Sequence, residues 1–264
     1  MPFRRLPNTM PAVIRTLITA RDKRKNTPNP ADRAVTDAQF AHLDDTNPNS
    51  LLSLLIKEAT DVDIALAAQA PLTSALNQQG ARLTMYVSHF HQVGDFAILR
   101  GDLPLGSRGY WGRDIHATTI PDLSTYNALE IAAKAVVNGE ARRFADEGAA
   151  HTPMSNPSAG QIAGILSGFL NLRRSSEIAL EKTDDEREEA QALYPAAQAL
   201  AVDICETVEF FFRSDKVSSS FREKCRRWGV VYIYEPTEPR DAGDTTGPGT
   251  GGVAPVVPAP TPAP

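Results

Sequence analysis

The segment Ser88-His89-Phe90-His91 is the first place in this chain to look for metal chemistry. Imidazole is a common metal ligand, but residues two apart on a helix point away from each other, so His89 and His91 do not converge on one ion. A di-iron helical bundle needs Glu-x-x-His pairs on two helices, and the sequence contains none. We therefore expect no metal site and no cofactor.

Carboxylates are densest in a short acidic run near residue 186, which could supply a general acid and a general base. Because Thr183 and Glu186 have the spacing of a capping box, a solvated helix start is the simpler interpretation. The sequence also lacks a Gly-x-Ser-x-Gly elbow, a His-Glu-x-x-His pair, a P-loop and a dinucleotide fingerprint. We expect no catalytic residue and no enzyme. The acidic run comprises Asp184, Asp185, Glu186, Glu188 and Glu189.

A basic patch with an adjacent aromatic ring, from Arg222 to Trp228, has the residue types that contact phosphate and stack on bases. The patch is short, and Glu223 interrupts it. A formal net charge of -5 and a pI near 5.6 give no general attraction to polyanions. A solvated basic helix end is favoured, and weak nucleic-acid binding through this helix stays as an alternative.

The aromatic pair Tyr110 and Trp111 lies between two glycines in the loop 102–122, the longest internal loop expected. Large aromatic side chains are costly to expose, so they either fold back onto the end of a helical bundle or anchor a partner. Fold-back is favoured, and binding stays open. The two cysteines, Cys205 and Cys225, lack metal-site spacing and are expected to be buried thiols, although a bridge between them also stays open.

One run near the C-terminus, Val230 to Tyr234, is β-branched and aromatic and predicts a strand in a helical chain. A single strand needs a partner for its backbone, which could be the run Ile115–Ile120, another chain or water. Because successive side chains of a strand point to opposite sides, one face of this strand is expected to point towards the core. The candidate interaction residues are Tyr110, Trp111, Arg226, Trp228, Tyr232 and Tyr234.

Helical periodicity accounts for most of the remaining sequence. The first helix is expected after Asn8 and Thr9. The strongest pattern runs from Leu72 to Arg100, where apolar residues recur with the spacing of a helix–helix interface in a bundle; we call this stripe the seam. Only Gln79 interrupts it with a polar residue. Pro71 is expected to break or restart the helix that begins near residue 51. The heptad positions of the seam are Leu76, Leu83, Phe90 and Ala97, with Leu72, Tyr86 and Val93 interleaved.

Two later helices complete the pattern. One opens at Asn156-Pro157, and its glycines 160, 164 and 168 suggest close packing against a neighbour. The next starts at the capping box of Thr183 and is expected to kink at Pro195, since proline costs about 3 kcal/mol in a helix interior. Asn127 and Glu130 fit the start of another helix.

These elements predict an all-α fold, an antiparallel up-and-down bundle of five or six long helices with one short C-terminal strand. With 264 residues and 42% hydrophobic content, the chain can bury a sizeable core. We expect a helical bundle over 1–235, as one domain or as two packed halves (about 1–101 and 123–235) joined by loop 102–122. Residues 236–264 are rich in proline and glycine and predict a disordered tail.

Three segments resemble a family of uncharacterised helical bacterial proteins, found chiefly among the Bacteroidetes. They are Met1–Thr9, a central part with Tyr86–Phe90 and Ala97–Gly101, and the closing Arg222–Tyr232. The resemblance spans most of the chain but leaves out the proline-rich tail. It implies a shared helical architecture and transfers no catalytic residue.

The functional expectation is a non-enzymatic bundle that acts in protein–protein interaction or assembly, with a protein partner or self-association. The alternatives are a small-molecule or metal-dependent enzyme at the bundle end, and weak nucleic-acid binding. No apolar segment follows the basic N-terminus, and no run approaches the roughly 18 apolar residues of a membrane span. A cytoplasmic location without a membrane partner is therefore expected.

Overall fold

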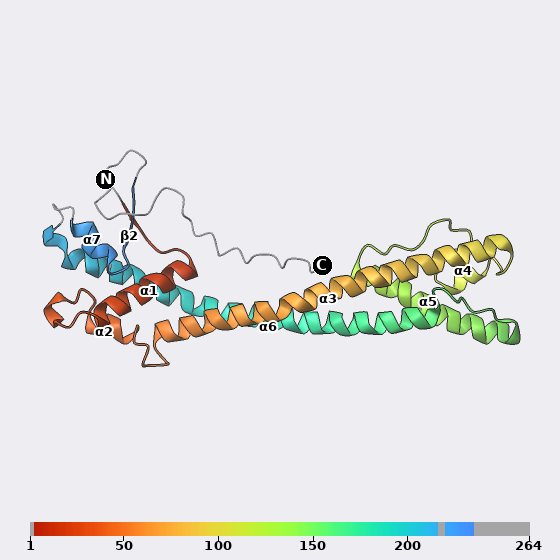
Figure 1. The fold of residues 1–264 in the computed structure, drawn as a ribbon, viewed down its shortest axis with the longest axis horizontal. Helices are drawn as coiled ribbons and strands as arrows, with labels where there is room; N and C mark the ends of the chain where they lie inside the picture. The colour runs from red at the N-terminus through yellow and green to blue at the C-terminus, as the bar shows by residue number, and fades with distance from the viewer. Residues whose placement is uncertain (1–2, 216–219, 235–264) are drawn as a thin grey trace, which may run out of the picture. The chain divides into compact units, whose positions relative to one another are not determined.

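The computed structural model describes residues 3–215 and 220–234, most of which are helical, so the predicted fold class is confirmed. The chain divides into two units (Figure 1). Unit 1 contains the residues up to Thr60 and from Arg187 onward, and unit 2 contains Asp61–Glu186. Among the described helices, none combines the length and apolar character needed to cross a membrane. The expected tail, 236–264, lies outside the described residues.

Two helices are longer than the sequence suggested. Helix α3 (Leu51–Arg100) continues through Pro71, and helix α6 (Ala159–Phe211) continues through Pro195. The expected break at Pro71 was therefore wrong. Both prolines are exposed, so water can bond the carbonyl that each ring frees, which lowers the cost of the missing hydrogen bond.

Unit 2 is built on the parts of α3 and α6 that lie within it, together with α5 (Tyr126–Glu147). The seam predicted between Leu72 and Arg100 is confirmed, because its heptad positions are buried in this unit's core. A four-residue helix α4 (Ser107–Tyr110) and a 3-10 turn η2 (Gly148–Ala150) complete the unit. The core contains, among others, Leu76, Leu83, Phe90, Ala97, Leu129, Val136, Ile162 and Phe169.

The gap in the seam has a structural explanation. The Gln79 side chain donates a hydrogen bond to the carbonyl of Ile165 at 3.1 Å. A Cβ at Gly168 would lie 2.9 Å from the Gln79 amide nitrogen, so this glycine allows a close approach, whereas Gly164 has open space around it. The expected capping box at Thr183 was wrong: Thr183 lies inside α6, and its hydroxyl donates to the carbonyl of Ala179 at 2.8 Å.

Unit 1 joins the two ends of the chain. Its sheet has two antiparallel strands, β1 (Phe3–Arg5) and β2 (Val231–Ile233), of which β2 is labelled in Figure 1. Arg4 lies opposite Tyr232 in the register of the two strands. The strand predicted near the C-terminus therefore pairs within its own chain. The run Ile115–Ile120, one of the proposed partners, forms turns rather than a strand. The other elements of this unit are α1 (Met10–Lys25), η1 (Pro30–Asp32), α2 (Asp37–Ala41), η3 (Arg213–Asp215), α7 (Ser220–Arg226) and the adjoining ends of α3 and α6.

The turn between α7 and β2 requires a glycine. Gly229 has a φ of +97°, which L side chains rarely adopt. A Cβ there would also lie 2.9 Å from the carbonyl oxygen of Thr16 in α1. This residue therefore reverses the chain and brings β2 against α1, while Trp228 next to it is buried in the core of unit 1.

Candidate binding groove

A groove of about 480 Å³ lies in unit 1, beside α1 and the two strands. Its walls come from three parts of the chain: residues 5–9, which connect β1 to α1; the first two and a half turns of α1; and the segment from Arg226 to Tyr232. The volume falls within the range of sites that bind small ligands. Because β1 pairs with β2 of the same chain, two segments that are far apart in the sequence together form this concave surface.

The charged residues that line the groove are all cationic: Arg5, Arg15 and Arg226. Within the described residues, the side chains of Arg5 and Arg15 are exposed and have no hydrogen-bond or ion-pair partner. Arg226 is held in place, since it donates to the hydroxyl of Tyr234 and lies over the rings of Tyr232 and Tyr234 at 5.8 and 5.4 Å. The groove is therefore a positively charged site with two uncompensated guanidinium groups.

The opposite face of the sheet is electrically compensated. Arg4, adjacent to Arg5, forms ion pairs with Glu209 at 3.1 Å and Glu206 at 3.3 Å, both on α6. The Tyr232 hydroxyl donates to Glu209 at 2.6 Å, and burial together with this hydrogen bond raises the pKa of Tyr232, which keeps the phenol protonated. Successive side chains of a strand point to opposite faces of the sheet. Arg4 therefore meets its glutamate partners on α6, whereas Arg5 lies at the groove without a partner among the described residues.

Four of the six candidate interaction residues belong to this part of unit 1. Arg226 and Tyr232 line the groove, and Tyr234 holds Arg226. Trp228 is only 2% exposed, so its ring stabilises the core below the groove and is not presented at the surface. Cys205 and Cys225 are buried in the same core and form no disulfide, and burial raises the pKa of Cys205 to about 11.

The other two candidates, Tyr110 and Trp111, lie in unit 2, where the fold-back interpretation is confirmed. Trp111 is fully buried, and its indole donates to Glu140 at 2.7 Å. Arg143, also fully buried, donates to both carboxylate oxygens of Glu140 at 2.8 and 3.1 Å. Burial alone would raise the pKa of Glu140, but the hydrogen bonds from Arg143 and Trp111 hold it below its usual value. Tyr110 is half-buried and donates to Asp146 at 2.7 Å.

The two histidines considered as ligands lie on different sides of α3. His89 is exposed, and His91 is fully buried beside Trp111, with their ring centroids 6.5 Å apart. Neither ring nitrogen of His91 has a hydrogen-bond partner among the described residues. Burial and the nearby Arg113 guanidinium lower the pKa of His91 to about 4, against an opposing effect of Asp95. His91 is therefore a neutral core residue at physiological pH.

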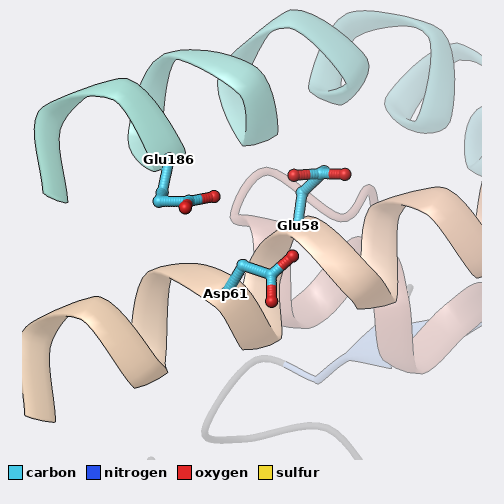
Figure 2. Close-up of side chains that lie close together, drawn as sticks. All are labelled: Glu58, Asp61 and Glu186. Atoms are coloured by element: carbon cyan, nitrogen blue, oxygen red, sulfur yellow. The ribbon is translucent and has the colours of Figure 1, made fainter. Parts of the chain in front are cut away.

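Figure 2 shows three carboxylates of α3 and α6. Glu58 belongs to unit 1, whereas Asp61 and Glu186 belong to unit 2 and could each offer an oxygen ligand to a cation. Glu58 and Asp61 lie one turn apart on α3 and so share a face of that helix. Asp61 and Glu186, both in unit 2, have carboxylate oxygens within 4.8 Å. The Glu58 carboxylate accepts a hydrogen bond from Lys57 at 2.7 Å, so a local cation already compensates part of this charge. Acidic groups in such proximity are common without a bound ion.

Sequence reasoning missed the two arginines that give the groove its charge. Arg5 belongs to a strand of only three residues, which is too short to show a period of two. Arg15 lies on α1 between the buried residues Val13 and Leu17, on the face away from the core. The available signal was the first half of α1, Met10–Ala20, in which Arg15 is the one charged residue.

No protein-family model matches the chain, and neither the curated proteins nor the solved structures that were searched contain a match. The helical character of the chain is shown by the structure itself. The resemblance to a bacterial family stays a prediction from the sequence.

Proposed function

We propose that this protein works by protein–protein interaction, as an adaptor or an assembly component, and that the groove of unit 1 is its docking surface. The observation that carries the proposal is the pair of exposed guanidinium groups of Arg5 and Arg15 in a concave surface, neither of which has a partner in the part of the chain that the structure describes. A partner that supplies carboxylates would compensate them. A cytoplasmic setting and membership of the helical bacterial family belong to this proposal as expectations from the sequence.

No feature of the described residues favours the alternative of an enzyme at the bundle end. His91, the titratable group beside Trp111 of loop 102–122, is fully buried, so a substrate would need a rearranged bundle end to reach it. The nucleic-acid alternative concerns the basic helix from Arg222 to Trp228, which shares Arg226 with the lining of the groove. An oligonucleotide is therefore compared with the peptide as a ligand.

Affinity capture with groove variants tests the proposal. The full chain, the double variant Arg5→Glu/Arg15→Glu and the control Arg174→Glu are compared by quantitative mass spectrometry in a lysate of the source organism. Arg174 is an exposed cation of unit 2 that lies outside the groove. We expect a partner, or a second copy of the chain, that the full chain and the control retain and the double variant loses. Identical sets of bound proteins for all three would contradict the proposal.

A further inference from the structure

The groove has the charge and lining to select one class of partner. Two guanidinium groups from different elements, Arg5 at the end of β1 and Arg15 on α1, line it together with apolar surface from Leu6, Pro7 and Val231. Guanidinium groups bind carboxylates through paired N–H donors, and the charge-assisted bonds are about twice as strong as neutral ones. A ligand that combines carboxylates with small apolar groups would complement both kinds of surface.

We propose that the groove binds a short acidic peptide segment of a partner protein, whose aspartate or glutamate side chains pair with Arg5 and Arg15. This proposal rests on the proposed function and names its partner class. Charge complementarity is the reason: among residues 3–215 and 220–234, the groove is lined by three cations and by no acidic residue, whereas Glu206 and Glu209 are engaged by Arg4 on the other face of the sheet.

A peptide fits the groove better than a nucleic acid does. The net charge of -5 opposes the approach of a long polyanion, while a short acidic segment experiences mainly the local field of the groove. Apolar residues also interrupt the cations, which suits alternating side chains of an extended segment. The first turn of α1 strengthens the local field, since it has no acidic side chain and the Thr9 side chain caps no backbone N–H.

The test uses fluorescence anisotropy with a labelled peptide of about eight residues in which aspartate and valine alternate, and the full chain as receptor. We expect the single variants Arg5→Ala and Arg15→Ala each to weaken binding by about tenfold, and a peptide with asparagine in place of aspartate to bind at least tenfold more weakly. The control Arg174→Ala should bind within about twofold of the full chain. Raising salt from about 50 to about 200 mM should weaken binding several-fold.

Folding is checked separately for each variant. Because Arg5 and Arg15 are exposed and have no partner within the described residues, their replacement by alanine should change the free energy of unfolding by less than about 0.5 kcal/mol. A binding loss with an unchanged unfolding transition then reports on the groove itself.

Four results would overturn the acidic-peptide proposal. The first is that the asparagine peptide binds as tightly as the aspartate peptide, and the second is that both groove variants bind the aspartate peptide as tightly as the full chain does. The third is that a single-stranded oligonucleotide of the same charge binds more tightly than the peptide. The fourth is that the peptide binds only after the substitutions Glu235→Gln/Glu238→Gln. The last result would identify this chain's own following segment as the occupant. A failed peptide test beside a captured partner that depends on Arg5 and Arg15 would leave the proposed function intact and reject only the acidic partner.

Discussion

At the scale of single residues, neighbouring arginines of one strand have different roles. Arg4 faces two glutamates of α6 and stabilises the sheet, whereas Arg5 lies at the groove without a partner among the described residues. Alternation in a strand of three residues is enough to separate them. A mutational scan that treated the two as equivalent would confuse a structural ion pair with the residue that we propose to bind a partner.

His91 should make the stability of unit 2 depend on pH. The pKa of His91 is lowered from 6.5 to about 4 by burial and by Arg113, so the unfolded chain takes up a proton near pH 6.5 and the folded chain does not. Stabilisation is therefore complete above pH 6.5 and is lost as the pH falls towards 4, by up to about 3 kcal/mol.

Denaturant unfolding between pH 7.5 and about 4.5 checks this prediction. Trp111 in unit 2 becomes the only tryptophan in a Trp228→Phe background, so its fluorescence reports on that unit. His91→Gln should remove most of the decline, because glutamine does not titrate, while His89→Gln at the exposed neighbouring position should leave it unchanged. An equal decline in the His91→Gln variant would assign the pH dependence to the carboxylates instead.

At the scale of elements, the contact between α4 and α5 depends on a glycine. A Cβ at Gly139 of α5 would lie 2.0 Å from the carbonyl oxygen of Tyr110, which real contacts never reach. Gly139→Ala must displace the segment around Tyr110 and Trp111, and we expect it to destabilise unit 2 by about 2 kcal/mol or more, as overpacking does.

Gly164 in α6 provides the matched control for this prediction. Apart from its two neighbours and the backbone of the adjoining helical turns, no described residue has an atom within 4 Å of a Cβ built there, and alanine favours a helix over glycine by up to about 1 kcal/mol. Gly164→Ala should therefore leave stability unchanged or increase it, as measured by thermal unfolding. If both variants unfolded at the same temperature, the close packing of α5 on the Tyr110 carbonyl would be disproved.

How far the sequence predicts each element depends on the length of its pattern. The seam from Leu72 to Arg100 is long and regular, so its buried face could be predicted from spacing alone. The continuity of α3 through Pro71 depends on the exposure of that proline, which only the tertiary structure determines. The partner of β2 could not be predicted because β1 has three residues and lies at the other end of the chain.

At the scale of the whole molecule, the candidate site could not be recognised as a motif. Its walls come from residues 5–19 and 226–232, which the pairing of β1 with β2 and the close contact of Gly229 with α1 bring together. The sequence did indicate Arg226 and Tyr232 as interaction residues, because cationic and aromatic side chains adjoin a strand there. It gave no reason to combine them with Arg5 and Arg15, since that depends on a long-range contact.

The central claim is that the groove formed by both ends of the chain is the docking surface of this protein. Hydrogen exchange of the full chain, with and without a saturating amount of the alternating aspartate–valine peptide, tests it most directly. We expect slower amide exchange in segments that cover residues 5–19 and 226–232, with unchanged exchange in 61–186. Slower exchange confined to 61–186, or no change in any segment at saturation, would contradict the claim.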